Sequence, residues 1–421
     1  MKTILKYFKR SSLIFKVLLL GYSVSGQIYT WGDISSSNKN YTVISVVEGK
    51  ANQIFVLGKV TDKNQGNPQI GYSCLSNNGD ILFTTVYTDQ PDLYNLNSIL
   101  FQPDGLLRIY GTSYLQSGMM APYMACINPE SKVITNTILK LSTPQSLGDV
   151  KLINNKEIIL ANASKGLSTG IFNIFASRTD LTAKDLQKIN VKLDSKFNEE
   201  PKSLCVLHDS SFYILGKRYS DQSMTKSEGM IYYISSDFKM KWNMEVLNSS
   251  GLSDQCLSCG KDGWIYYFCS FKDKNTGTCS SKGFIFDKDG NKLRQILIDS
   301  NNVHSILTLK NGNILVAGTK IQKDGSKTLE KAHYIIYDRT LKKIKSRTLG
   351  LTDKPDVDLP QTQISAFQSS SDYTTSIQLS NGKILLGGRI FLPINTSPDK
   401  IINSTRAYKY LVVILTANGD L

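Results

Sequence analysis

Histidine is the residue from which catalysis or metal binding is most readily recognised, and this sequence contains little of it. The chain of 421 residues has three histidines, His208, His304 and His333. They fall in different segments, and no spacing brings them together, so we expect neither a His-based nucleophile nor a metal site. We interpret all three as structural residues.

Two acidic segments offer weaker candidates. Asp287 and Asp289 are spaced like the start of a calcium loop, but the glycine follows too early and no Glu closes the loop. A hairpin turn is the better interpretation. Asp356 and Asp358 could serve as a carboxylate pair, but they lie in a proline-containing stretch that we expect to be a solvated loop. The sequence therefore names no catalytic residue.

The seven cysteines indicate an oxidising environment only in part. Cys256 and Cys259 form a C-x-x-C pair, but no second pair and no nearby His supports zinc binding. Cys269 would lie at the end of one strand and Cys279 just before the next, so we expect a disulfide between them. Because seven is odd, at least one cysteine has no partner within the chain. Buried thiols are expected at Cys74, Cys126 and Cys205.

A repeated apolar segment that ends in a small or polar residue, usually Gly, indicates the elements that hold these residues. Its copies begin 49 to 54 residues apart, except for a last step of 70. A turn such as Asn311-Gly312 usually precedes the segment, and one or two more strands follow it, so each repeat predicts four antiparallel strands. We expect the final Gly to turn the chain sharply where the strand ends. The seven copies are Ile54–Gly58, Leu107–Gly111, Ile158–Asn162, Phe212–Gly216, Ile265–Cys269, Ile314–Gly318 and Ile384–Gly388.

The number of strands predicts how the repeats assemble. Four antiparallel strands repeated at about 50 residues are the blade of a β-propeller. The last repeat stops after its third strand, and Gln27–Ile34 is a spare strand that can complete that blade. The sequence therefore predicts an all-β fold: a seven-bladed β-propeller over residues 27–421, with four-stranded antiparallel blades and a ring closed by the N-terminal strand.

The blades resemble a "DGxIlvaG…yyi…D.nG" repeat found in secreted propellers of bacteria and protists. The resemblance covers residues 27–421 and implies a seven-bladed structure, but it identifies no functional family. The WD and Gly-His signatures of WD40 blades are absent from the sequence. Propellers include lectins, scaffolds, hydrolases and quinoproteins, so the fold does not give the function.

Residues 1–26 are expected to be a signal segment. They carry five basic residues and no acid, then a short apolar stretch and small residues before Gln27, which is typical of a secretory signal cleaved there. A mitochondrial presequence is the main alternative, and an uncleaved membrane anchor is the third. In a secreted or lumenal protein the candidate glycosylation sites are Asn40, Asn248, Asn395 and Asn403.

Basic residues concentrate in the loops of one predicted face. In a propeller the loops between the second and third strands lie on the same face as the connections between blades. Those loops hold 17 basic and seven acidic residues, a net +10, whereas residues 27–421 together carry +9. We therefore expect one positive face that recognises an anionic surface. Its candidate residues are Lys217, Arg218, Lys272, Lys274, Lys320, Lys323, Lys327, Lys331 and Arg389.

These observations favour a non-catalytic binding or scaffold propeller, secreted or lumenal. Its partner would be a protein or an anionic glycan or lipid surface, with no nucleic acid expected if the chain is secreted and no cofactor indicated. One alternative is a propeller enzyme of the glycosidase or quinoprotein type, which would need carboxylates or a metal at the central channel. The other is an accessory subunit of a membrane or organellar complex. The oligomeric state is left open.

Overall fold

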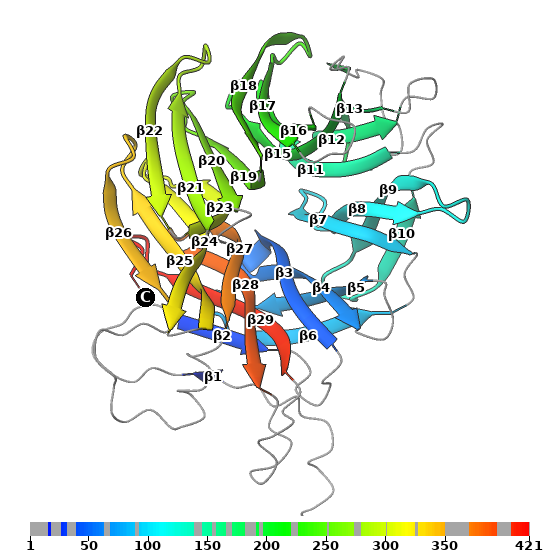
Figure 1. The fold of residues 1–421 in the computed structure, drawn as a ribbon. Coiled ribbons are helices and arrows are strands. Elements are labelled where there is room, and N and C mark those ends of the chain that lie inside the picture. The colour runs from blue at the N-terminus through cyan, green and yellow to red at the C-terminus, as the bar shows by residue number, and fades with distance from the viewer. Residues whose placement is uncertain are drawn as a thin grey trace, which may run out of the picture.

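The computed structural model is a ring of seven antiparallel sheets arranged around a central axis (Figure 1). In the part of the chain that the structure describes, no helix is long and apolar enough to cross a membrane. The described residues are 16–17, 27–31, 39–62, 68–88, 92–138, 145–153, 157–165, 171–181, 191–192, 197–219, 226–250, 252–272, 279–299, 301–324, 327–349, 370–393 and 406–420.

Blades 1 to 3 are four-stranded meanders in chain order. A single 3₁₀ turn, η1 (Lys50–Asn52), joins the first two strands of blade 1. Blade 1 contains β3 (Lys39–Glu48), β4 (Ile54–Asp62), β5 (Pro68–Leu75) and β6 (Ile81–Tyr87). Blade 2 contains β7 (Leu93–Phe101), β8 (Leu107–Tyr114), β9 (Met120–Ile127) and β10 (Ile134–Ile138). Blade 3 contains β11 (Gln145–Ile153), β12 (Glu157–Lys165), β13 (Phe172–Asp180) and β14 (Val191–Lys192).

Blades 4 to 6 repeat the same order, and blade 7 supplies three strands. Blade 4 contains β15 (Asn198–Val206), β16 (Phe212–Tyr219), β17 (Lys226–Ile234) and β18 (Met240–Ser250). Blade 5 contains β19 (Leu252–Cys259), β20 (Ile265–Lys272), β21 (Cys279–Phe286) and β22 (Lys292–Asp299). Blade 6 contains β23 (Asn301–Thr308), β24 (Ile314–Asp324), β25 (Lys327–Tyr337) and β26 (Lys343–Thr348). Blade 7 contains β27 (Ser371–Gln378), β28 (Ile384–Pro393) and β29 (Arg406–Leu415).

The N-terminal strand closes the ring, as the sequence predicts. β2 (Gln27–Trp31) pairs antiparallel with β29, with Gln27 opposite Ile414 and Trp31 opposite Tyr410. In Figure 1 the two ends of the chain therefore meet in one sheet, β2 in blue beside β29 in red. The two-residue strand β1 (Lys16–Val17) adds to the outer edge of β2. The predicted seven blades and their closure are confirmed.

The core lies between blades rather than at the axis. Seven clusters of buried apolar side chains each join two neighbouring blades, so that every interface in the ring has its own cluster. At the closing interface, Val412 and Ile414 of blade 7 pack with Val43 and Val56 of blade 1. Because each blade is covered on both sides, its second strand is apolar on both faces, which explains the repeated segment in the sequence.

The turns predicted before the second strands are also confirmed. Gly312 has φ +84° and its N–H donates to the carbonyl of Leu309 at 2.9 Å, while the Asn311 side chain accepts from the Asn313 N–H at 3.0 Å. Glycine is needed there because a side chain is strained at such a φ. The candidate calcium segment is likewise a hairpin turn, in which the Asp287 carboxylate accepts the backbone N–H groups of Asp289 and Asn291.

Every innermost strand is interrupted by a β-bulge at the same level of the ring. At this level the register of each first strand against the second skips one residue, or two in blade 5, and β7 of blade 2 skips a further residue, Tyr94, nearer its start. A bulged residue leaves the hydrogen-bonded ladder and its side chain is re-aimed. We call the residues skipped at this shared level the bulge ring: Ile44, Asn97, Gly148, Lys202, Ser253 with Asp254, His304 and Thr374.

The glycine at the end of the repeated segment serves these bulges and does not end a strand. β24 continues past Gly318 to Asp324, so the prediction of a sharp turn there is wrong. Gly318 lies opposite the bulge of β23, and a Cβ on it would stand 2.0 Å from the carbonyl oxygen of Asn302. At Gly388 the same distance, to the Asp372 carbonyl oxygen, is 1.9 Å. The missing side chain makes room for the bulged backbone.

The disulfide joins two blades and is not the predicted one. Cys205 of β15 is bonded to Cys259 of β19, which links blade 4 to blade 5. Cys205 is therefore not a buried thiol as expected, whereas Cys74 and Cys126 are thiols. Because the two bonded residues are 54 positions apart on different blades, their proximity depends on the packing of the ring.

Cys269 and Cys279 do not form a disulfide, and the register explains why. Cys279 pairs with Lys272, three residues along β20 from Cys269. Residues separated by an odd number of positions point to opposite faces of a strand, and three positions span about 10 Å. The two sulfur atoms therefore lie on opposite faces of the blade, and the prediction of this disulfide is wrong.

Candidate functional site

The polar members of the bulge ring lie on consecutive blades around the axis. The innermost strands of neighbouring blades contact one another, so their bulges lie together around the axis of the ring. Ionisable side chains occupy the bulges of blades 4, 5 and 6, namely Lys202, Asp254 and His304, and Thr374 follows on blade 7. Blades 1 to 3 carry no ionisable residue at this level. The chemical functions are thus concentrated on one side of the ring.

Asp254 and His304 form an ion pair across the blade 5–blade 6 boundary. His304 Nδ1 lies 3.3 Å from Asp254 Oδ2, and His304 Nε2 lies 3.3 Å from the Thr319 hydroxyl. The side chains remain 21% and 45% exposed, respectively, so solvent reaches both. Burial opposes charge on His304, but the hydrogen bond and charge of Asp254, with a further contribution from Asp372, raise the pKa of the imidazole above its ordinary value.

The same ion pair lowers the pKa of the Asp254 carboxylate. Burial by itself would raise the pKa of Asp254, but the hydrogen bond and charge of His304 lower it below its ordinary value. The Asn302 side chain and the charge of Lys202 act in the same direction. Asp254 is therefore ionised at neutral pH and lies in reach of cationic groups from both neighbouring blades.

Two lysines approach this pair from blade 4. Lys202 forms a 2.8 Å salt bridge with Glu200, and Lys217 donates to the carbonyl of Leu252 at 3.2 Å. Burial and then the charge of Lys202 lower the pKa of Lys217, while Glu200 and Asp254 oppose that effect. The two ammonium groups therefore repel one another at one place on the axis.

Tyrosines lie close to this group of charges. Tyr94 and Tyr114 are exposed on blade 2, with their rings edge to face at 5.5 Å. The Lys217 ammonium lies 5.2 Å from the ring centre of Tyr219. Burial and the charge of Glu200 raise the pKa of Tyr219, and Tyr94 is near enough to contribute. We call this group the axial site: Tyr94, Glu200, Lys202, Lys217, Tyr219, Asp254 and His304.

The basic residues predicted to form one face lie in different surroundings in the structure. Arg218 forms salt bridges with Glu228 at 2.6 Å and Glu245 at 3.1 Å, and Arg389 forms one with Asp372 at 2.9 Å. These arginines are neutralised locally.

Lys331 does not belong to an exposed surface. Its side chain is 3% exposed, and burial lowers its pKa to about 8. Of the other predicted lysines, Lys217 belongs to the axial site and Lys320 to a groove between blades 5 and 6. Lys274 and the side chains of Lys272, Lys323 and Lys327 lie outside the described residues.

The remaining sequence candidates are placed only in part. Asn40 lies on β3 and is partly exposed. Asn248 lies on β18, and its side chain is outside the described residues. Asn395, Asn403 and the acidic segment 353–361 also lie outside them. In the described part of the chain, no group of three or more His, Cys, Asp or Glu side chains is arranged to hold a metal ion.

Sequence reasoning missed most of the axial site, although a signal for it exists. In six blades the bulged residue precedes the last residue of the repeated segment by 14 positions, as with His304 and Gly318 or Lys202 and Gly216. Reading the sequence at this offset would have placed Lys202 and His304 on one ring. The interpretation of His304 as a structural residue stays a prediction, and the structure adds that its imidazole pairs with Asp254 of the neighbouring blade.

The fold defines the class of the protein, a seven-bladed β-propeller. No protein-family model matches the chain, and no curated protein matches it in sequence. A solved protein of unknown function from Dyadobacter fermentans is 10% identical, with a TM-score of 0.51 over 90% of this chain and 96% of that one.

Two further structures are similar at lower scores. The β-propeller domain of the trilobed protease from Pyrococcus furiosus has a TM-score of 0.46 and 8% identity, covering 89% of this chain and 93% of that one. An α-L-arabinofuranosidase from Fusarium graminearum has a TM-score of 0.45 and 12% identity, covering 70% and 92%. These likenesses concern the fold alone, so the function is argued from the residues.

Proposed function

We propose that this protein is a binding propeller that recognises an acidic glycan at the axial site, in an extracellular or lumenal setting. The observation that carries the proposal is the convergence of Lys202 and Lys217 beside the partly exposed Tyr219. Two ammonium groups that repel one another gain most from an added anion between them. The protein has a formal net charge of +14, which also favours an anionic partner.

The other members of the axial site suit the hydroxyl groups of a sugar. Glu200 and Asp254 can accept hydrogen bonds, and His304 can donate one or accept one according to its protonation. Tyr94 of the site, together with its ring neighbour Tyr114, offers flat apolar surfaces with polar tips, on which a sugar ring can pack. A uronate or sulfated sugar would thus meet charge, hydrogen-bonding groups and an aromatic surface in one place.

Binding of heparin and of polygalacturonate to residues 27–421, followed by fluorescence anisotropy or calorimetry, tests this function. We expect affinity to fall as salt increases and to be absent for neutral dextran. The K202A and K217A variants should each weaken binding by about tenfold, as expected for the loss of one charge-assisted hydrogen bond. K292A, on the exposed outer strand of blade 5, is the matched control and should bind like the wild type.

Two outcomes would oppose the proposal. Axial variants that bind like the wild type would place recognition elsewhere, and affinity that does not respond to salt would exclude an electrostatic basis. Chromatography of the polymer after incubation addresses the enzymatic alternative, because a glycosidase shortens its ligand and a binding protein does not.

A further inference from the structure

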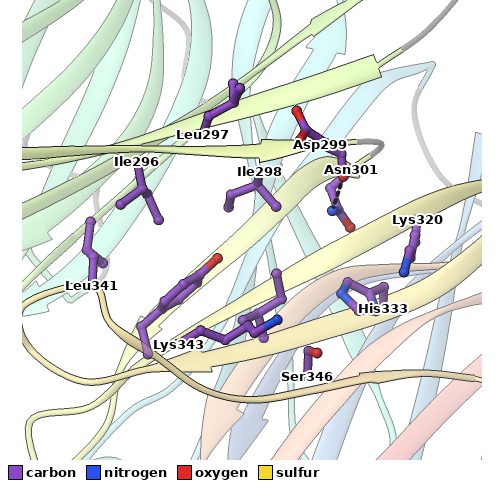
Figure 2. A pocket seen from close by; sticks show the side chains of 12 residues that line it. Ile296, Leu297, Ile298, Asp299, Asn301, Lys320, His333, Leu341, Lys343 and Ser346 are labelled. Atoms are coloured by element: carbon purple, nitrogen blue, oxygen red, sulfur yellow. Dashed lines mark hydrogen bonds between the residues drawn. The ribbon is translucent and has the colours of Figure 1, made fainter.

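A groove of about 370 Å³ separates the outer strand of blade 5 from the outer half of blade 6 (Figure 2). Ile298, Ile335 and Tyr337 are buried along it. Figure 2 shows Lys320 and His333 next to one another at the end opposite Leu341. The volume falls within the range of small-ligand sites. The groove lies between blades rather than at the axis and is separate from the axial site.

One face of blade 6 supplies the cationic groups of the groove. In the ladder β24–β25–β26, Lys320 pairs with Lys331, His333 with Thr348, and Tyr337 with Lys343. Alternate residues of a strand share a face, so Lys320, His333 and Lys343 all lie on the side of blade 6 that faces blade 5.

Within the part of the chain that the structure describes, the two exposed or partly exposed lysines of this face form no salt bridge with a carboxylate. None of the salt bridges among the described residues involves Lys320 or Lys343, whereas Lys202, Arg218 and Arg389 each have one. Asp299 is the acidic residue in the groove lining. The groove therefore carries a net positive charge that the described residues leave uncompensated.

The charges of both lysines affect the pKa of His333. Its Nδ1 lies 2.8 Å from the Thr348 hydroxyl, and the ring is 7% exposed. Burial, then the charges of Lys320 and Lys343, lower the pKa of His333 to about 4, although a backbone hydrogen bond with Arg347 acts in the opposite direction. At neutral pH a neutral imidazole thus lies within the field of two ammonium groups.

We propose that this groove binds an anionic oxyester, a phosphate or sulfate monoester, with its charged group among Lys320, Lys343 and His333. A tetrahedral oxyanion offers several acceptor oxygens at once, which suits donors that come from three different strands. The organic part of the ligand then lies along Ile298 and Ile335. Phosphate and sulfate share this chemistry, and the experiment distinguishes them.

Anion binding is linked to the protonation of His333. A bound anion offsets the repulsion from the two lysines and favours the imidazolium, so it raises the pKa of the ring. The groups that face this ring are Lys320 from β24, Lys343 and the Arg347 backbone from β26, Asp299 from β22, and the buried Lys331 on its own strand.

The test follows the ring signals of the three histidines by NMR in the full chain, titrated with phenyl phosphate, phenyl sulfate and, as the neutral control, phenol. We expect one or both esters to raise the titration midpoint of His333 by about one pH unit, and phenol to leave it unchanged. By calorimetry, K320A and K343A should each weaken the ester by about tenfold. K292A should have no effect, and the His304 signal reports any binding at the axial site separately.

A His333 midpoint that saturating concentrations of both esters leave unmoved would overturn the proposal, as would wild-type affinity in the K320A/K343A double variant. K320R and K343R keep the charge and should retain binding, which guards against a merely misfolded variant. In the unliganded protein, K320Q should raise the His333 midpoint above about 4, because it removes one repelling charge. Polysaccharide binding at the axial site should be unaffected by all groove variants, so the two proposals fail independently.

Discussion

At the scale of single residues, the axial site is defined by charges that perturb one another across blade boundaries. Asp254 and His304 come from different blades, and each shifts the pKa of the other towards its charged form. Lys202 adds a third charge from blade 4. Such mutual perturbation is common at functional sites, because several ionisable groups are kept together without full compensation.

The Asp254–His304 pair should make stability depend on pH in a narrow window. Because the pKa of His304 is raised, its protonation stabilises the fold. This contribution is fully present below the ordinary histidine pKa of about 6.5 and is lost as pH rises through the raised value. Because the pKa of Asp254 is lowered, its ionisation also stabilises the fold. This contribution is fully present above the ordinary aspartate pKa of about 3.9 and is lost as pH falls through the lowered value. Both contributions are fully present only between about pH 4 and 6.5.

D254N should therefore lower the free energy of unfolding near pH 5.5 more than at pH 8. Because water reaches both side chains, we expect a difference of at most about 1 kcal/mol. Urea unfolding at the two pH values measures it, with D289N, in an exposed hairpin turn, as the control. An equal effect of D254N at both pH values would contradict the assigned ion pair.

At the scale of elements, the bulges and the glycines opposite them form one device. In blades 2, 6 and 7 the first strand is displaced at its bulge, and the second strand accommodates the displaced backbone by lacking a side chain at Gly111, Gly318 or Gly388. The glycine therefore matters through its neighbour and not through its own conformation, which distinguishes it from the turn glycine Gly312.

G318A should destabilise the protein by about 2–3 kcal/mol, because the added methyl group meets a backbone carbonyl that cannot move alone. G118A is the matched control. Its site is open, with nothing within 4 Å of the added Cβ, but its φ is +75°, so only the left-handed conformation costs energy, about 1 kcal/mol. Chemical unfolding compares the two, and equal losses would mean that the carbonyl contact is unimportant.

The disulfide acts between two elements, β15 and β19. Loss of a cross-link that closes 54 residues should cost about 4 kcal/mol in the chain-entropy view. The C205A/C259A variant should show this loss without reducing agent, and dithiothreitol should bring the wild type to a similar stability. C126A is the control, because Cys126 is a thiol in the structure.

The sequence could predict what is periodic and could not predict what depends on register. Second strands such as Ile314–Gly318 and turns such as Asn311-Gly312 recur, and chance does not reproduce such a pattern seven times. The disulfide partner of Cys205 and the meeting of Asp254 with His304 depend on how neighbouring blades pack. Local spacing carries no information about that packing, so the sequence could give the fold and the ring positions of Lys202 and His304, but not the contacts that those residues make.

At the scale of the whole molecule, the two ends of the chain hold the ring shut. β2 covers the edge of β29, and the cluster between blades 7 and 1 completes the circle of seven interfaces. An uncovered edge strand presents unpaired N–H and C=O groups that recruit other chains. Closure therefore protects solubility as well as stability.

Removing residues 1–31 should expose that edge, whereas removing residues 1–26 leaves β2 in place. We expect the shorter truncation to remain monodisperse and the longer one to lose thermal stability and to associate as its concentration increases. Light scattering and differential scanning calorimetry of both proteins measure these effects. Indistinguishable behaviour of the two truncations would show that the closing strand is dispensable.

In the bulge ring, the residues available for ligand binding are separate from the residues that hold the strands together. A residue that takes no part in the hydrogen-bonded ladder can change its identity with little effect on the strand pairing around it. Ile44, Asn97 and Gly148 show how varied those positions already are. Substitutions at a few positions of such a ring can therefore change its ligand preference while the scaffold stays constant. This makes the bulge ring a natural starting point for engineering new binding proteins.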